Sequence, residues 1–544
     1  MKRIKGTRWR VILGPPGTGK TTAATKGFAA EIKNRGTDAD HLYFITFTRR
    51  AMNEAKDKLQ DPLKGHGLLP SDVENVRTMH GQALKLLGGK HGSLIAGKHW
   101  KVFRQAGWRT MKHEQDRVLL DALNWGRAYG LDLVETERCC PHLFDRVRFR
   151  RFVAEYTAFK RANRLIDHTD SLELVLRLGL VPPRNVEKIF FDEAQDFSLL
   201  QAKVADLWAS VAHHALAFGD DDQCIFTFQG SSAAWLAAKF KAHGGRVLSQ
   251  SHRVPRLPRR LAELIISKNP NRVRKSYYPR DADGSIVRVA HLDDLISRLV
   301  GKDNLVLARD AYALVPVALR LKELGIPFAD TTKDREANSY EEGLAIAAAK
   351  TAVSLTNGFL VSASDIVEML SFVDYRRRSL VPNKVATVAA LQAMQNAPIA
   401  AAGVVQILHG GTLLRELAAH GPLGALKFVD AEHKAVAAHL AKGGTAAKIV
   451  LSTIHSTKGG QAAVVAIVPD MSRRSFLELQ RDPETERRLA YVAVTRTKDT
   501  LVLMSPRTPM HFADYFLPVP GVPAGPAKRQ PAAAVALAPS PASP

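Results

Sequence analysis

The apolar residues in the first half of the chain gather in short runs that end at polar residues or glycines. Residues 9–13 form one such run and lead through a Gly/Pro loop into a helical pattern over residues 20–33. Three more runs of this kind lie at 41–47, 187–193 and 214–220. Buried strands that alternate with helices predict a parallel α/β sheet.

The second half of the chain repeats this pattern. Its apolar runs lie at 304–310, 448–455, 463–470 and 500–505. We therefore expect an α/β fold with two parallel-sheet cores of similar design and a cleft between them.

A mainly helical pattern interrupts each predicted core, and the chain ends in a biased segment. The tail holds 8 prolines and 8 alanines in 27 residues, which is typical of disorder. The expected plan is a first core at 1–89 and 178–250 with an insertion at 90–177, a second core at 251–329 and 447–517 with an insertion at 330–446, and a disordered tail at 518–544.

The net charge of the chain indicates which class of molecule it binds. The 544 residues include 77 Lys+Arg against 53 Asp+Glu, a net charge of +24 that favours a polyanion such as nucleic acid. No apolar run approaches the roughly 20 residues needed to span a bilayer, so we expect no membrane association. Three cysteines without metal-ligand spacing (Cys139, Cys140 and Cys224) favour a reducing cytoplasm.

The loop after the first predicted strand has the sequence GPPGTGKT. Between a strand and a helix, this spacing turns backbone N–H groups and a helix N-terminus toward phosphates. Lys20 would neutralise the β- and γ-phosphates, and the Thr21 hydroxyl would bind Mg²⁺. The residues expected to bind nucleotide in this loop are Gly14, Pro15, Pro16, Gly17, Thr18, Gly19, Lys20, Thr21 and Thr22.

A second strand, at 187–193, ends in the acidic pair of FFDEAQD. Asp192 is placed to hold Mg²⁺ opposite the loop, and Glu193 to orient or deprotonate the attacking water. Acidic residues after a strand also occur as helix caps, so the pair alone would not decide the matter. Together with the phosphate loop, it predicts nucleoside triphosphate hydrolysis.

Further motifs follow in order: ITFTRRAMNEA (45–55), VRTMHGQAL (76–84), FGDDDQCIFTFQG (218–230), SQSHR (249–253), LSTIHSTKGGQ (451–461) and RRLAYVAVTRTKDTL (487–501). With the two motifs above, this series resembles the UvrD/Rep/PcrA group of superfamily 1 DNA helicases, from about residue 11 to 505. The resemblance implies two RecA-like cores that clasp ATP between them, while single-stranded DNA crosses both.

The resemblance also implies roles for individual residues in these motifs. Gln223 would sense the γ-phosphate, and Arg253 and Arg496 would act as arginine fingers. The residues that match family DNA contacts are Phe47, Thr48, His80, Phe226, Phe228, His455 and Lys458. Aromatic faces stack on bases of any sequence, although the phenylalanines would also fit a hydrophobic core.

The stretch from His252 to Arg280 holds nine Lys/Arg and one Glu. Such a run could follow a nucleic-acid backbone by counterion release. A solvated basic face is the other interpretation of this charge.

The chain departs from the family pattern where the base and ribose of the nucleotide would bind. Family members carry a Gln-containing segment before the phosphate loop, whereas no Gln occurs among the thirteen residues before Gly14. His252 and Gln461, the expected base and ribose contacts, replace a Tyr and a Glu, and Gln229 replaces an Arg beside the DNA aromatics.

The sequence thus predicts an ATP- and Mg²⁺-dependent helicase that moves 3′→5′ on single-stranded DNA and unwinds tailed duplexes, in DNA repair, replication or recombination. We expect a monomer or a weak dimer. A helicase–nuclease would need a nuclease domain for which the Pro/Ala tail leaves no room. A DNA-stimulated ATPase that clears proteins from single strands, and an RNA-directed motor, remain open.

The changed residues at the expected base and ribose contacts lead to a first prediction. GTP or CTP should replace ATP more readily than in relatives, because the groups that read the base and ribose are changed while the phosphate site is intact. Steady-state hydrolysis of the three nucleotides in the presence of single-stranded DNA measures this. Turnover with ATP alone would contradict the prediction.

Overall fold

In this computed structural model, the described residues are 7–61, 65–96, 99–100, 102–103, 114–140, 145–183, 185–299, 304–324, 326, 328–331, 348, 351–356, 361–373, 381, 384–394, 398–399, 412–426 and 449–517. The chain forms two compact units. The first comprises Met1–His291 and Thr457–Pro544, and the second Leu292–Ser456. The expected tail and much of the expected insertion at 330–446 lie outside the described residues.

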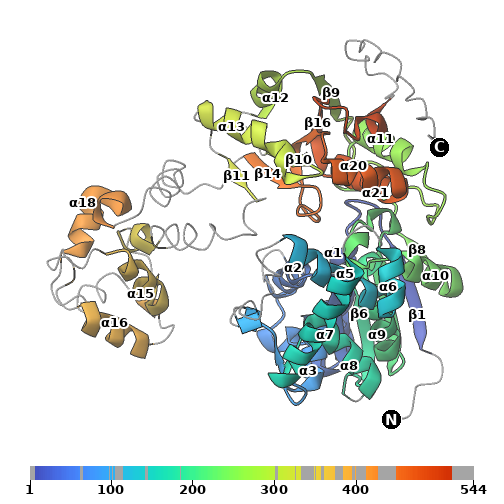
Figure 1. The fold of residues 1–544 in the computed structure, drawn as a ribbon, viewed down its shortest axis with the longest axis horizontal. Helices are drawn as coiled ribbons and strands as arrows, with labels where there is room; N and C mark the ends of the chain where they lie inside the picture. Colours follow the sequence, from blue (N-terminus) through green and yellow to red (C-terminus); the bar gives the residue numbers. More distant parts are fainter. Residues whose placement is uncertain are drawn as a thin grey trace, which may run out of the picture. The chain divides into compact units, whose positions relative to one another are not determined.

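The first unit contains a six-stranded parallel sheet in the order β3-β2-β6-β7-β1-β8. Figure 1 labels β1, β6 and β8 of this sheet. Its strands are β1 (Arg8–Leu13), β2 (Leu42–Thr46), β3 (Val76–Thr78), β6 (Val186–Phe191), β7 (Ala212–Gly219) and β8 (Gly245–Val247). The four predicted strands form the middle of this sheet. The two edge strands were missed because three residues give too short a pattern to detect.

Helices cover both faces of this sheet. One apolar layer packs beneath α1 (Lys20–Arg35) and α2 (Arg49–Gln60) and contains Phe28 and Leu59. The other layer packs beneath α3 (Met79–Leu87), α8 (His168–Leu178), α9 (Leu199–Ala209) and α10 (Ala234–His243). Because both faces are covered, all five residues of β2 are buried and read as a continuous apolar run.

The register brings the loops of the predicted site to one edge of the sheet. Leu13 at the end of β1 pairs with Gly219 at the end of β7, and Phe191 at the end of β6 pairs with Ala217. Parallel strands end together at the same edge, so the segments that follow these three strands meet there.

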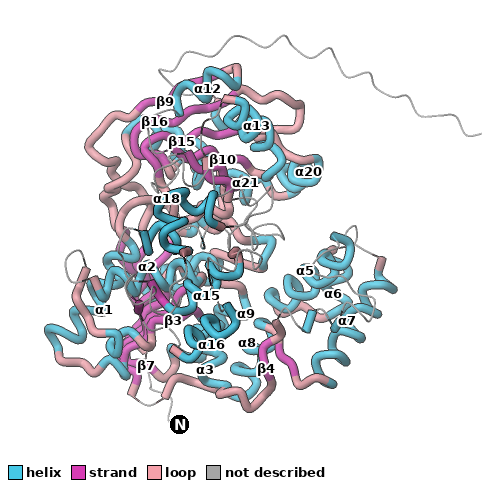
Figure 2. The backbone as a smooth tube through the Cα atoms, turned by 90° about the vertical axis from the view of Figure 1, so that its left-hand side faces the viewer, coloured by secondary structure: helices cyan, strands magenta, loops and turns pink. Residues whose placement is uncertain are grey.

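The insertion between α3 and α8 is helical, as expected. Figure 2 shows α5 (Glu114–Tyr129), α6 (Leu133–Cys139) and α7 (Arg146–Ala162) as one group. Aromatic residues such as Phe103, Phe152 and Tyr156 form their shared core. A two-stranded parallel pair, β4 (Ser93–Leu94) and β5 (Leu165–Ile166), accompanies these helices.

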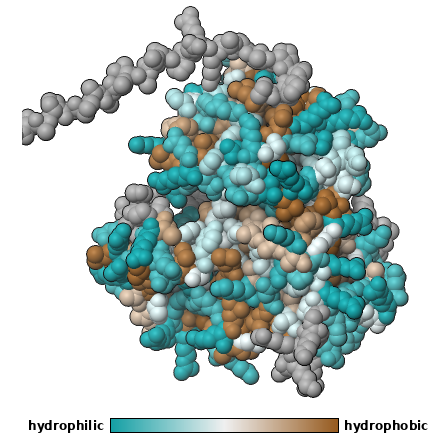
Figure 3. All heavy atoms as spheres, turned by 90° about the vertical axis from the view of Figure 1, so that its right-hand side faces the viewer, coloured by the Kyte–Doolittle hydropathy of each residue, from teal (hydrophilic) through white to brown (hydrophobic). Residues whose placement is uncertain are grey.

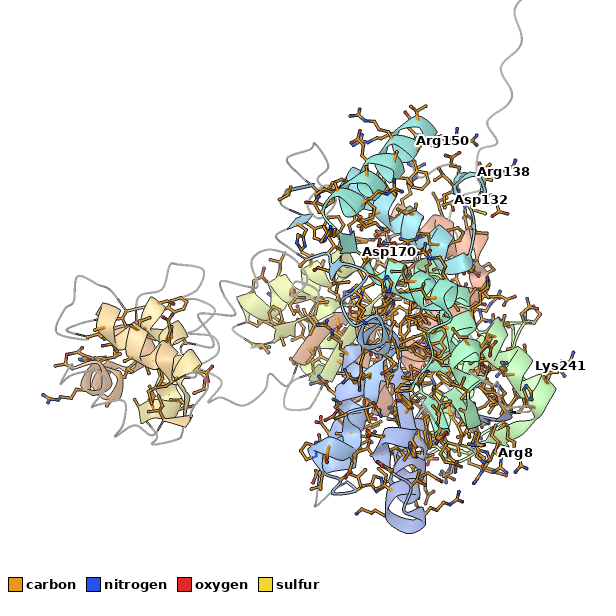
Figure 4. The ribbon with its side chains drawn as sticks, turned by 90° about the horizontal axis from the view of Figure 1, so that it is seen from below. Arg8, Asp132, Arg138, Arg150, Asp170 and Lys241 are labelled. Carbon is orange, nitrogen blue, oxygen red and sulfur yellow. The ribbon has the colours of Figure 1, made fainter. Side chains whose placement is uncertain are left out.

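A cluster of ion pairs joins this insertion to α8. Arg127 of α5 contacts Asp167 at 3.0 Å, Asp170 at 2.6 Å and Glu173 at 2.7 Å. Lys160 of α7 contacts both aspartates at 2.6 Å. Asp170, labelled in Figure 4, lies in the first turn of α8. The surrounding cations, Arg127 foremost, outweigh the effect of burial and lower the pKa of Asp167 to about 2.

The remaining elements of the first unit include three parallel strands in the order β15-β16-β9. These are β9 (Ser285–Val289), β15 (Ala462–Val468) and β16 (Thr497–Met504), and the helices are α11 (Arg256–Ile266), α20 (Arg473–Arg481) and α21 (Pro483–Val494). Helices α11 and α21 pack against each other.

The second unit contains β10 (Asn304–Ala308), β14 (Ile449–Thr453) and β11 (Ala329–Asp330), which also pair in parallel. Its helices are α12 (Leu292–Leu299), α13 (Val315–Glu323), α15 (Ala363–Ser371), α16 (Lys384–Ala393) and α18 (Leu413–Ala425), and a short antiparallel pair joins β12 (Val361–Ser362) to β13 (Pro398–Ile399). The expected α/β fold with parallel-sheet cores is confirmed.

Figure 3 shows hydrophilic residues over much of the visible face, with smaller hydrophobic areas between them. Among the described helices, none is both long enough and apolar enough to cross a membrane.

The ion-pair cluster at the base of the insertion leads to a second prediction. The change Arg127→Met should lower the free energy of unfolding by about 3 kcal/mol, because it leaves buried carboxylates without one of their cations. The matched control Arg151→Met removes a surface arginine that pairs with Glu155 on the same helix, and should cost less than about 0.5 kcal/mol. Urea denaturation followed by far-UV circular dichroism measures both. Equal losses in the two variants would contradict the prediction.

Candidate nucleotide site and nucleic-acid surface

The phosphate loop joins β1 to α1 at the carboxyl edge of the first sheet. Its first glycine is anchored to the sheet, because the Gly14 N–H donates to the Gly219 carbonyl at 2.9 Å. Thr18 closes the loop on itself by donating through its hydroxyl to the Pro15 carbonyl at 2.8 Å. Gly19, which precedes the first residue of α1, has φ 79°, a left-handed conformation that favours glycine. The N-terminus of α1 therefore faces the loop.

Gly17 allows a second segment to approach the loop closely. The His252 N–H donates to the Gly17 carbonyl at 2.9 Å, and the Ser251 hydroxyl donates to the Pro16 carbonyl at 2.8 Å. A Cβ atom on Gly17 would overlap the side chain of Arg253, and φ there is +74°. The glycine is thus needed for the contact that brings His252 and Arg253 to the loop.

Thr21 and Asp192 meet as the sequence predicts. The Thr21 hydroxyl donates to Asp192 Oδ2 at 2.8 Å, while the other carboxylate oxygen, Oδ1, is buried without a hydrogen-bond partner among the described residues. Burial and the neighbouring Glu193 raise the pKa of Asp192 to about 7. A hydroxyl beside an unsatisfied carboxylate oxygen fits the oxygen ligands that Mg²⁺ requires.

Glu193, the residue after Asp192, has a strained backbone. Its φ of 53° is unusual for a residue other than glycine, and an observed outlier of this kind often marks a functional position. Gln195 holds the carboxylate through its amide nitrogen. Burial works to raise the pKa of Glu193, but Lys458, Lys20 and other nearby groups outweigh it, so the pKa lies below its usual range. The side chain is therefore ready to accept a proton or orient a water.

A series of hydrogen-bonded side chains adds to the site. Gln223 donates through Nε2 to Asp220 Oδ2 at 2.8 Å and accepts at Oε1 from Arg496 Nη2 at 3.0 Å. Arg496 is 1% exposed, and burial together with Arg253 lowers its pKa to about 9. Arg253 donates to Gln461 Oε1 at 2.6 Å. Gln223, the predicted γ-phosphate sensor, thus lies at the same site as Arg253 and Arg496, the predicted arginine fingers.

These groups line a cavity of about 370 Å³ in the first unit. Its lining includes Gly17, Gly19, Lys20, Thr21, Thr22, Glu193, Gln223, His252, Arg253, Lys458, Gln461 and Arg496, all named from the sequence. Glu54 and Lys58 of α2 also line it and form an ion pair at 2.7 Å. Sequence reasoning missed these two, although their spacing of four residues in ITFTRRAMNEAKDKL is a detectable signal.

Lys458 lies between this cavity and a row of aromatic rings. It pairs with Asp196, donates to the Gln223 carbonyl at 2.8 Å, and lies 5.1 Å from the centre of the Phe226 ring. Burial raises the pKa of Asp196 to about 7 against the opposing effect of Lys458.

The aromatic row consists of Phe47, Phe226 and Phe228. The ring centres of Phe47 and Phe226 are 5.7 Å apart, and those of Phe226 and Phe228 are 6.1 Å apart. Phe228 is 56% exposed and the other two are half-buried, so the rings are not a closed hydrophobic core. An accessible row of rings can stack on unpaired bases.

Besides Lys458, the remaining predicted DNA contacts are Thr48, His80 and His455. Thr48 caps α2 by accepting from the Ala51 N–H at 3.1 Å, but the residue is exposed. The ring of His80 packs at 5.3 Å from that of His168. His455 is half-buried in the second unit.

The basic stretch from His252 to Arg280 is partly neutralised within the protein. Arg272 and Lys275 are directed into the first unit, where both pair with Asp222 at 2.5 Å and 2.7 Å. Three more of its arginines form ion pairs, namely Arg256, Arg259 and Arg280. The hypothesis that the whole stretch follows a nucleic-acid backbone is therefore wrong for Arg272 and Lys275, because acidic partners distant in sequence bury them.

A glycine loop between strand and helix, with a lysine, a threonine and a carboxylate from a neighbouring strand, is the arrangement of P-loop nucleotide-binding proteins. Comparison with known families is more specific. Residues 4–242 match the UvrD/REP helicase N-terminal domain, and residues 448–504 match the UvrD-like helicase C-terminal domain. These matches cover more than half of the chain, which belongs to the UvrD/Rep helicase family.

Individual relatives are distant. The chain is 24% identical over 371 residues to YjcD of Bacillus subtilis, a match that covers 61% of this chain and 47% of YjcD. It is 24% identical over 314 residues to the ATP-dependent DNA helicase Rep of Escherichia coli, covering 51% and 44% of the two chains. The ATP-dependent DNA helicase SRS2 of Saccharomyces cerevisiae is 24% identical over 273 residues, 42% of this chain and 22% of SRS2. The chain therefore spans about half or less of the length of these relatives.

Among solved structures, Arterivirus nonstructural protein 10 (helicase) aligns with 93% of this chain and 61% of its own at 11% identity. The TM-score of 0.32 is too low to support an argument.

The environment of His80 leads to a third prediction. Burial and the neighbouring His168 together lower its pKa to about 4, and Asp167 only partly opposes them. The unfolded chain therefore binds more protons than the folded one between pH 6.5 and 4, so stability falls as the pH drops through that window. From pH 7 to pH 5, His80 should account for a loss of about 2 kcal/mol in the free energy of unfolding.

Urea denaturation at the two pH values measures this loss in the wild-type protein and in His80→Gln, which should be less sensitive to acid. The exposed His243→Gln serves as control. Equal acid sensitivity of all three proteins would contradict the prediction.

Proposed function

We propose that this chain is an ATP- and Mg²⁺-dependent DNA helicase that moves 3′→5′ along single-stranded DNA. The observation that carries the proposal is the segment 220–229. It holds Gln223 against Arg496 in the nucleotide cavity. Three residues later, it carries the ring pair of half-buried Phe226 and exposed Phe228. A nucleotide-sensing group and a base-stacking surface on one short segment suit a motor driven by ATP.

In the proposed nucleotide step, Lys20 neutralises the phosphates and Glu193 orients and accepts a proton from the attacking water. Mg²⁺, held by Thr21 and Asp192, would supply charge neutralisation at the phosphate oxygens. Arg253 and Arg496 stabilise the negative charge of the transferring phosphoryl group, and Gln223 holds the water or the γ-phosphate in place.

In the proposed DNA step, unpaired bases stack on Phe47, Phe226 and Phe228. Lys458 supports coupling between the two sites, because it touches both the Gln223 carbonyl and the face of the Phe226 ring. His80 and His455 would contribute hydrogen bonds to the strand. The proposed 3′→5′ direction rests on the resemblance of the motifs to those of the family. DNA is the proposed substrate because the relative Rep of Escherichia coli is an ATP-dependent DNA helicase.

Unwinding tests the proposal as the fourth prediction. Short duplexes with either a 3′ or a 5′ single-stranded tail are mixed with the protein, ATP and Mg²⁺, and strand separation is followed by fluorescence. Only the 3′-tailed duplex should be unwound. Glu193→Gln should lower the rate by at least about a hundredfold, because it removes the proton acceptor while preserving shape.

Controls separate the alternatives. Unwinding of the 5′-tailed duplex alone would overturn the direction. DNA-stimulated ATP hydrolysis without unwinding of either duplex would favour a strand-clearing translocase, and stronger stimulation by RNA would favour an RNA-directed motor. Absence of nucleotide hydrolysis with any of these nucleic acids would refute the proposal as a whole.

A further inference from the structure

Lys275 is buried against three consecutive aspartates beside the nucleotide cavity. Asp220, Asp221 and Asp222 follow β7 and are between 0 and 2% exposed. The Lys275 ammonium, 1% exposed as a side chain, lies 3.0 Å, 2.5 Å and 2.7 Å from their carboxylates in that order. Three such carboxylates could in principle hold a metal ion, but here a lysine occupies the space between them.

The segment that carries Lys275 is fixed to these aspartates by further contacts. Arg272 donates to both oxygens of Asp222, at 2.7 Å and 2.5 Å, and the Val273 N–H donates to Asp221 Oδ2 at 2.7 Å. Neither of these contacts reaches Asp220. Of the described side chains of this segment, Lys275 is thus the one that pairs with Asp220, the aspartate that also contacts Gln223.

Asp220 in turn orients Gln223. A glutamine amide can flip, since its two ends have nearly the same shape but opposite hydrogen-bonding character. Asp220 accepts from Gln223 Nε2, which leaves Oε1 directed at Arg496. An ionised Asp220 can only accept, so it pairs with the amide nitrogen of Gln223 and not with the amide oxygen. Burial works to raise the pKa of Asp220, but Lys275 opposes it most strongly, and the pKa lies below its usual value.

We propose that Lys275 is a positioning residue for nucleotide hydrolysis, which holds the Asp220 side chain in place so that Asp220 fixes the amide of Gln223 between itself and Arg496. This inference rests on the proposed function, because it assigns Gln223 a role in that reaction. Lys275 itself does not line the nucleotide cavity. Its influence on turnover must therefore pass through Asp220 and Gln223.

A double-mutant cycle tests this proposal as the fifth prediction. Lys275→Met should lower the DNA-stimulated kcat for ATP by at least about tenfold, with a much smaller change in KM, because a slightly misplaced Gln223 affects the reacting geometry more than ATP binding. Combined with Gln223→Ala, it should add almost nothing to the loss caused by Gln223→Ala alone. Lys275→Arg, which retains the charge, should recover part of the activity.

Arg272→Gln is the matched control, since Arg272 pairs with the same aspartate cluster but not with Asp220. It should lower kcat by less than about threefold. If Lys275→Met fails to fold, the cycle is run with Asp221→Asn/Lys275→Met, which removes one charge of each sign and retains an acceptor for the Val273 N–H. Thermal melting and binding of a fluorescent ATP analogue report folding in every variant.

The outcomes separate this inference from the proposed function. Absence of DNA-stimulated hydrolysis in the wild-type protein would refute the proposed function. With an active wild type, additive losses in the cycle, or equal losses in Lys275→Met and Arg272→Gln, would overturn the role of Lys275 and leave the helicase proposal standing.

Discussion

The buried carboxylates at the carboxyl edge of the first sheet must be neutralised inside the protein, and the rest of the site depends on this constraint. Five aspartates in the segments after β6 and β7 are between 0 and 2% exposed, namely Asp192, Asp196, Asp220, Asp221 and Asp222. An isolated buried carboxylate would be too costly to keep ionised. Cations from distant parts of the sequence meet this demand at Asp196 and at the three aspartates after β7. The segments that supply these cations become fixed to the edge of the sheet.

The cations in the cavity are themselves incompletely balanced. Burial lowers the pKa of Lys20, and burial with Arg253 lowers that of Arg496 to about 9, although several carboxylates lie nearby. Cations that repel one another in a confined space favour the binding of an anion. The arrangement thus suits a polyphosphate, and the orphaned oxygen of Asp192 suits the metal ion that would accompany it.

Much of the fold and of the nucleotide site could be predicted from the sequence because the signals are local. The phosphate loop, the Asp192–Glu193 pair and the strands that precede them each occupy fewer than about ten consecutive residues. The sequence could not reveal ion pairs between residues that lie far apart along the chain. Arg272 and Lys275 look like part of a solvated basic run, and only the fold brings them to aspartates some 50 residues earlier. Phe226 and Phe228 were ambiguous for the same reason, since exposure depends on neighbours that the sequence does not name.

The segment from Asp220 to Gly230 is anchored at both ends. Lys275 and Arg272 fix its beginning, while Ser231, directly after it, donates through its hydroxyl to the Asp196 carbonyl. Between these anchors lie Gln223 on the cavity side and Phe226 and Phe228 on the aromatic side. A short backbone segment with fixed ends has few ways to move, so a displacement of Gln223 by nucleotide must alter the nearby rings as well. On this argument, the burial of Lys275 does more than neutralise charge: it supplies one of the fixed points against which such a displacement can be transmitted.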